Sequence, residues 1–213
     1  DAIARSDGTL LGVVNMSESY SDGDLERLHA GGIRGARFSL MSDRIGNRDA
    51  IEAAIPRLER MGWSLDLHIE PVHLINEIDF VRDIPVPVII DHIGRVDPAS
   101  GLDQPAMVLL LELLRDERFW VKISGADKLS HDRRAHPKDG SLPFRDFIPY
   151  AKAVIEAAPN QVLWGTDWPH PNIDGLMPND ADLVDLLALY APDAEIRQRI
   201  LVDNPARLYK FDP

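Results

Sequence analysis

Six strand-like segments that alternate with helical segments constrain the fold of this 213-residue chain more than any other feature. Each is short, rich in β-branched or aromatic residues and bounded by turn residues. We predict strands over 10–16, 35–40, 64–70, 86–94, 119–125 and 161–168. Apolar periodicity and capping residues predict helices over 22–28, 51–61, 72–81, 104–116, 144–157 and 180–190, then a C-terminal pair at 195–200 and 205–209. Because strand–helix–strand units build parallel sheets, the predicted fold class is α/β.

The number of units indicates which parallel sheet this is. A (β/α)8 TIM barrel takes ~250 residues, about 30 for each unit. Six units and two terminal helices account for the 213 residues, so we predict one partial TIM-barrel domain over 1–213 that lacks its first two units. We place the loss at the N-terminus, because the chain begins with Asp1 rather than Met and its first residues resemble the end of a helix. A doubly wound open sheet is the alternative, but no G-x-G-x-x-G turn follows any predicted strand.

Composition argues against several classes of function. With 35 acidic and 23 basic side chains, the net charge of -12 argues against binding to nucleic acids or anionic membranes. No apolar run approaches the ~20 residues of a membrane span and no signal segment opens the chain, so we expect a cytoplasmic protein. With no cysteine, a metal would have to bind to His, Asp, Glu or a modified Lys. The exposed sheet edges of a partial barrel need further chain or a partner to cover them, so a homo-oligomer is one of the expected possibilities.

Polar residues on the predicted strands indicate a cavity. Strands covered on both faces are almost continuously apolar, yet in 64–70 three apolar residues alternate with Asp66, His68 and Glu70. The same alternation predicts polar faces on neighbouring strands, with the residues Arg37, Ser39, His92, Lys122 and Ser124. His92 is predicted to share its face with Ile90 and Gly94. Buried charges cost several kcal/mol unless they are paired, hydrated or metal-bound, so these groups fit the mouth of a barrel, where active sites lie.

The strongest local motif is GTDWPHPN at 165–172. Pro169 and Pro171 cannot continue a strand ladder, so Asp167 is held where the last strand ends. An Asp at such a position often caps the next turn or helix instead. Because His68 and His92 stand at the ends of earlier strands, we favour convergence of these three side chains at one cavity.

Five motifs, taken in order, resemble the amidohydrolase-related branch of the amidohydrolase superfamily. They are GARF at 35–38, IDHIGR at 90–95, WVKI at 120–123, GTDWPHPN at 165–172 and NPARLY at 204–209. The resemblance covers essentially the whole chain and implies a barrel of the metal-dependent hydrolase type. Members of the family carry a His-x-His pair on the first strand, and no such pair occurs in the 213 residues.

The resemblance also implies roles for individual residues. Asp167 matches the eighth-strand acid that orients or deprotonates the attacking water, and His92 matches a catalytic histidine at the end of the sixth strand. His68 resembles the fifth-strand metal ligand of the zinc-dependent members, whereas a lactonase that works without a metal has tyrosine there. We therefore expect one divalent ion, zinc, on His68, His92 and Asp167.

The resemblance further implies that Arg37, Lys128 and Asn172 bind a small carboxylated substrate. Lys128 stands where the metal-free lactonase has arginine, and a point charge cannot replace a bidentate fork, so we expect a different substrate. The predicted function is a catabolic hydrolase that opens a carboxylated lactone, such as a pyrone, a muconolactone or a sugar-acid lactone, with water activated by Asp167. A lactone isomerase, a metal-dependent decarboxylase and a non-catalytic acid-binding barrel remain alternatives.

Overall fold

The computed structural model describes residues 2–41, 48–132, 137, 141–173 and 175–211. Within them six strands form one sheet in the order of the sequence, and every neighbouring pair is parallel. The strands are β1 (Gly12–Asn15), β2 (Ile33–Ser39), β3 (Ser64–His68), β4 (Val88–Ile90), β5 (Phe119–Ile123) and β6 (Val162–Trp164). A doubly wound sheet would reverse its strand order at a switch point. The sequential order therefore confirms the prediction of a partial barrel and excludes the doubly wound sheet.

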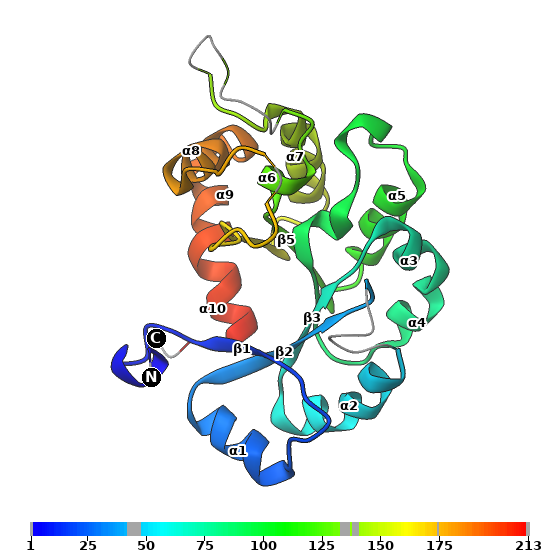
Figure 1. Cartoon of the computed structure of the whole chain (residues 1–213), viewed down its shortest axis with the longest axis vertical. Coiled ribbons are helices and arrows are strands. Elements are labelled where there is room, and N and C mark those ends of the chain that lie inside the picture. The colour runs from blue at the N-terminus through cyan, green and yellow to red at the C-terminus, as the bar shows by residue number, and fades with distance from the viewer. Residues whose placement is uncertain (1, 42–47, 133–136, 138–140, 174, 212–213) are drawn as a thin grey trace.

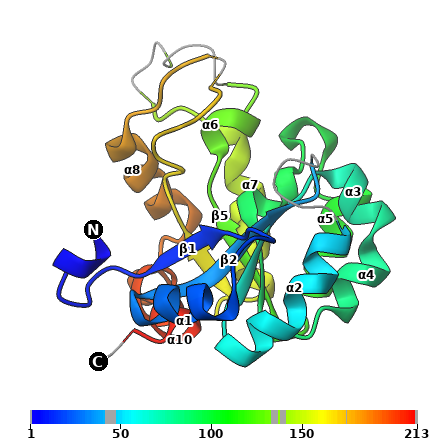
Figure 2. The ribbon, with the colours of Figure 1, turned by 60° about the horizontal axis from the view of Figure 1, so that its bottom comes forward.

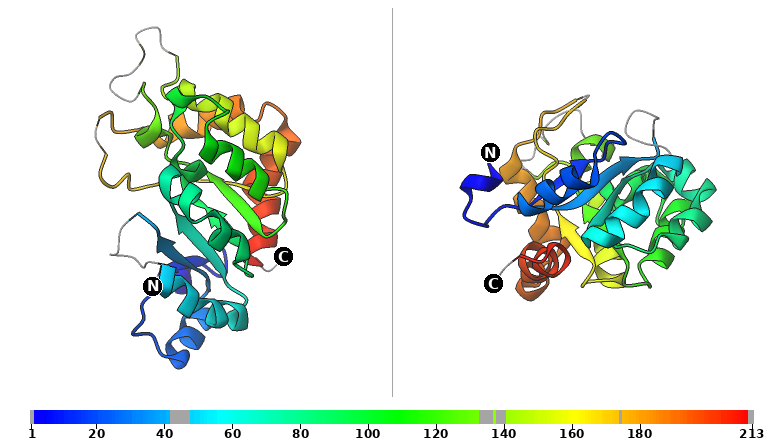
Figure 3. Two further views of the ribbon diagram at one scale, coloured as in Figure 1. Left: turned by 90° about the vertical axis from the view of Figure 1, so that its right-hand side faces the viewer. Right: turned by 90° about the horizontal axis from the view of Figure 1, so that it is seen from below.

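The helices follow the strands, and most of them cover the outer side of the sheet (Figures 1, 2 and 3). They are α1 (Asp22–Ala30), α2 (Arg48–Met61), α3 (Pro71–Asn76), α4 (Ile78–Asp83), α5 (Pro105–Leu113), α6 (Ala126–Leu129), α7 (Ile148–Ala157), α8 (Asp180–Tyr190), α9 (Ala194–Gln198) and α10 (Asn204–Tyr209). The residues at the N-terminal ends explain why several of these helices begin where they do. Ser21 and Asp24 form a reciprocal capping box at α1, and proline occupies the first turn of α3, α5 and α7.

Strand register explains why the sheet has one apolar and one polar face. The outer face packs against the helices through the buried side chains of Phe38, Leu67, Ile90 and Val121. On the inner face Arg37 lies beside Asp66, and Lys122 follows two strands later. A small apolar cluster closes the lower part of the inner face, where Ile89, Trp120 and Leu163 pack against Leu208 and Tyr209. The predicted polar inner face is therefore present on β2, β3 and β5.

The strand predicted over 86–94 is much shorter than expected. β4 ends at Ile90, because the next residues form a turn in which His92, Ile93, Gly94 and Arg95 have φ angles between 49° and 61°. Such left-handed residues cannot continue a strand. The prediction that Ile90, His92 and Gly94 share a strand face is wrong, since Ile90 belongs to the outer face and His92 lies beyond the strand.

Other boundaries also differ from the predictions. β6 ends at Trp164 rather than at residue 168. The helix predicted over 72–81 is divided into α3 and α4 at Glu77, whose backbone leaves the helical region. The helix predicted over 144–157 begins at Ile148, after a short 3-10 turn. In the described part of the chain, no helix has the length and apolar character needed to cross a bilayer.

Candidate active site

The described residues form a cavity of about 640 Å³ at the carboxyl ends of the strands. Its wall includes all six side chains that the sequence predicts for the site: Arg37, His68, His92, Lys128, Asp167 and Asn172. The other lining residues are Met41, Asp91, Arg95, Lys122, Ser124, Gly165 and Pro171. The predicted convergence of His68, His92 and Asp167 on one cavity is therefore present in the structure. The roles of these residues stay predictions.

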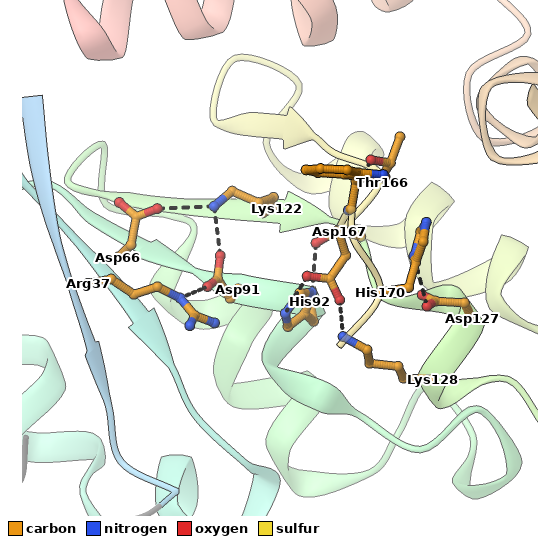
Figure 4. A network of polar contacts seen from close by, with 12 residues as sticks. Arg37, Asp66, Asp91, His92, Lys122, Asp127, Lys128, Thr166, Asp167 and His170 are labelled. Carbon is orange, nitrogen blue, oxygen red and sulfur yellow. Dashed lines mark hydrogen bonds and ion pairs between the residues drawn. The ribbon is translucent and has the colours of Figure 1, made fainter. Parts of the chain in front are cut away.

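An ion-pair network forms the floor of the cavity (Figure 4). Lys122 Nζ lies 2.7 Å from Asp91 Oδ1 and 3.0 Å from Asp66 Oδ2, and Arg37 Nε donates to Asp91 Oδ2 at 2.9 Å. Burial opposes the charge on Lys122, but Asp66 and Asp91 raise the pKa of its ammonium well above the usual range. Burial also opposes the charge on Asp91, yet Lys122, His92 and Arg37 lower its pKa. For Asp66 burial prevails and raises the pKa.

The two histidines of the cavity lie edge to face, with ring centroids 5.5 Å apart. Burial, together with the positive charge of Arg37, lowers the pKa of His68 to about 4. Burial also lowers the pKa of His92, partly opposed by Asp91 and Asp167. Both imidazoles are therefore neutral near neutral pH. His68 Nε2 is buried and has no hydrogen-bond partner among the described residues.

The position of His92 depends on its neighbours at the end of β5. Ser124 Oγ is 2.8 Å from His92 Nδ1, which leaves Nε2 to face Asp167. Gly125, with φ of 75°, allows the ring to lie this close, because a Cβ there would be 2.9 Å from His92 Nδ1. The sequence does not single out Ser124 or Gly125 as a support for His92, although both stand at the end of the strand predicted over 119–125.

Asp167 lies where the chain turns after β6, with a φ of 67°. Its Oδ1 is 3.9 Å from His92 Nε2, and its Oδ2 accepts a hydrogen bond from the ammonium of Lys128 (Figure 4). Left-handed backbone at a residue other than glycine is disfavoured and concentrates at functional sites. Lys128, which is predicted to bind the substrate, lines the cavity and also contacts the predicted base.

The residues present do not fit a divalent ion by themselves. Among the described residues, no three His, Asp or Glu side chains are close enough together to bind one. His68 Nε2 has no hydrogen-bond partner among the described residues and could bind a metal ion, but the Asp167 carboxylate already forms an ion pair with Lys128. The described lining carries four cationic side chains, those of Arg37, Arg95, Lys122 and Lys128, against the carboxylates of Asp91 and Asp167. This charge balance favours an anion, and the zinc ion stays a prediction.

Comparison with known proteins gives the relatives of the chain. The family model described as Amidohydrolase matches residues 1–211. The chain is 38% identical over 212 residues to the 2-pyrone-4,6-dicarboxylate hydrolase of Comamonas testosteroni, covering 98% of this chain and 70% of that protein. It is 36% identical over 214 residues to the 4-sulfomuconolactone hydrolase of Rhizobium radiobacter, covering 98% of this chain and 69% of that one.

The structural comparison agrees with the sequence comparison. A crystal structure of an Agrobacterium tumefaciens protein superposes with a TM-score of 0.84 at 27% identity, covering 99% of this chain and 74% of that one. Four of the five motifs contribute residues to the cavity lining, and the fifth, at 204–209, packs against the inner face of the sheet through Leu208 and Tyr209. The family match spans nearly every residue. This chain is a member of the amidohydrolase family.

Proposed function

We propose that this protein is a hydrolase that opens the ring of a carboxylated lactone. The observation that carries the proposal is the position of Asp167, a carboxylate that faces a cationic cavity beside two neutral histidines. The names of two relatives, at 38% and 36% identity, denote hydrolases of a pyrone dicarboxylate and of a sulfomuconolactone. Both names describe anionic lactones, which suit the charge of the cavity.

Substrate binding is assigned to side chains whose polar atoms remain available. Arg37 uses Nε for Asp91, and among the described residues no side chain forms a hydrogen bond with its two terminal nitrogens. These nitrogens can pair with a carboxylate in a bidentate contact. The amide of Asn172 lies in the same wall and can donate a further hydrogen bond. Together they would orient the lactone with its carbonyl toward His92 and Asp167.

The chemical step requires a base, a polarised carbonyl and a proton for the leaving oxygen. Asp167 accepts a proton from the attacking water, whose oxygen forms a bond to the lactone carbonyl carbon. Neutral imidazole N–H groups of His68 or His92 donate to the carbonyl oxygen as it becomes negative. The ring C–O bond then breaks, and protonated Asp167 returns its proton to the leaving oxygen. General acid–base catalysis of this kind contributes typically ~10²- to 10⁴-fold in rate.

No step of this proposal passes through a metal ion. The zinc ion that the resemblance implies would polarise the carbonyl and lower the pKa of water, but the described side chains do not form its site. Metal analysis of purified protein, with activity measured after chelation and after zinc is added back, tests that prediction. Full activity in a demonstrably metal-free preparation would contradict it.

Hydrolysis of a panel of lactones tests the proposed function. The panel pairs each carboxylated lactone with the same ring lacking the carboxylate, and proton release reports ring opening. We expect turnover of carboxylated rings and a much lower kcat/KM for their uncharged counterparts. No ring opening across the carboxylated set would overturn the proposal.

Product analysis in isotope-labelled water separates hydrolysis from isomerisation. A hydrolase incorporates one water oxygen into the new carboxylate, whereas a lactone isomerase returns a lactone by an intramolecular transfer. Labelled ring-opened acid supports the hydrolase. An unlabelled rearranged lactone as the main product would indicate the isomerase.

A further inference from the structure

His170 is a buried histidine just beyond the cavity, where it lies between two carboxylates. It is 5% exposed, its Nδ1 is 3.2 Å from Asp127 Oδ2, and its Nε2 is 3.4 Å from Asp180 Oδ1. Asp127 is completely buried. These three residues belong to α6, to the turn after β6 and to the start of α8, so the contacts join three separate elements.

Asp167 lies in the same turn as His170, and two side-chain interactions connect this turn to α6. Lys128 donates to the Asp167 carboxylate, and the preceding residue, Asp127, contacts His170 (Figure 4). The turn is also closed internally, because the His170 backbone N–H donates to the Asp167 carbonyl at 2.8 Å. A displacement of His170 would therefore be transmitted to the backbone of Asp167.

The backbone of this turn needs such support. Asp167, His170 and Asn172 all have left-handed backbone, with φ of 67°, 57° and 58°. Residues other than glycine keep this conformation only where the surrounding structure holds them. Neither His170 nor Asp127 is among the residues that line the cavity, so they would not touch the substrate.

We propose that Asp127 and His170 form a brace that positions the Asp167 carboxylate for proton transfer. Both are positioning residues, and their effect on turnover rests on the proposed function. Misplacement of a reacting group by about 1 Å can cost about 10²-fold in rate. The brace should therefore act on kcat, while substrate binding, which is assigned to Arg37 on β2, changes little.

Two substitutions at His170 test the brace, with a matched control elsewhere. His170→Ala should lower kcat about 10²-fold with KM nearly unchanged, and His170→Asn, which keeps a donor toward Asp127, should recover at least about 10-fold of that loss. The control is His131→Ala, since His131 Nε2 also faces a carboxylate, Asp97 Oδ1 at 2.7 Å, but on the exposed surface. Its kcat should equal that of the unsubstituted enzyme.

Asp127→Asn, which preserves shape, replaces His170→Ala if that variant fails to fold, and the same loss of kcat is expected. The brace is overturned if kcat per folded molecule in the His170→Ala or Asp127→Asn variant matches the His131→Ala control. It is also overturned if His170→Asn recovers nothing, because a donor toward Asp127 would then have no importance.

A readout that needs no turnover separates failure of the brace from failure of the proposed function. Trp168, which is 74% exposed, lies within the braced turn. Iodide quenching of its fluorescence, assigned by comparison with Trp168→Phe, should change in His170→Ala and stay constant in His131→Ala. Unchanged quenching in His170→Ala would overturn the brace even in a protein that hydrolyses no lactone. A protein with altered quenching and no hydrolysis would retain the brace and lose the proposed function.

Discussion

Lys122→Met should reduce the free energy of unfolding by about 3 to 5 kcal/mol, because it removes the shared partner of two buried carboxylates. The side chains of Asp66 and Asp91 are 2% and 3% exposed, and Lys122 Nζ lies 3.0 and 2.7 Å from their oxygens. Arg37 would still pair with Asp91, so the cost falls mainly on Asp66, whose pKa is already raised by burial. Methionine keeps the length of the side chain, so lost packing adds little.

Urea unfolding followed by circular dichroism measures this change. Lys152→Met, on an exposed position of α7, is the control and should change stability by no more than about 0.5 kcal/mol. In Lys122→Met the folded pKa of Asp66 rises further above its unfolded value. The folded state then binds the proton more tightly, so the lost stability returns as pH falls. A loss below about 1 kcal/mol, or one that does not shrink between about pH 7 and about pH 5, would refute the reasoning.

Three further predictions concern the site. Arg37→Gln should raise KM for a carboxylated lactone by about 10- to 100-fold with little change in kcat. The reason is that the substitution removes a charged hydrogen bond that is present both in the bound substrate and in the transition state. An equal rise in KM for an uncharged lactone would contradict this role of Arg37. Lys128→Met should lower kcat more than it raises KM in steady-state kinetics, since the ammonium contacts Asp167, and a pure KM effect would show that it binds substrate instead. Burial lowers the pKa of His68 to about 4, so the unfolded chain protonates first below about pH 6.5 and thermal stability should fall between these values. In the His68→Asn variant, thermal stability should depend less on pH between these two values. If the unsubstituted protein and the variant lose stability equally over this pH range, His68 is not the group responsible.

The barrel and its polar inner face could be predicted because both follow from short-range patterns. Alternation along 64–70 separates Asp66 and His68 from the apolar positions whatever lies on the neighbouring strands. The pairing of Lys122 with two carboxylates could not be predicted in the same way, because it depends on the register between β3, β4 and β5. Asp91, a member of that network, carries no signal in the sequence beyond its place before His92.

His92 reaches the cavity for a different reason than the one expected. The sequence DHIGR contains one glycine, yet four consecutive residues, 92–95, have positive φ. Of these four residues only Gly94 is a glycine, the residue type that adopts positive φ most readily, so local propensity predicts that the strand continues. Nothing in the sequence around His170 predicts its burial against Asp127, which lies 43 residues earlier in the chain. Long-range contacts of this kind leave no periodic pattern.

The most direct test of the central claim is the turnover number of Asp167→Asn on a carboxylated lactone. Asparagine keeps the size of the side chain and can still accept a hydrogen bond from Lys128, so unchanged thermal unfolding should verify the fold. If Asp167 is the base, kcat falls by about 10²- to 10⁴-fold while KM changes little. A variant that turns over within about twofold of the unsubstituted enzyme would contradict the claim, since general-base catalysis would then contribute less than its usual minimum of about 10²-fold.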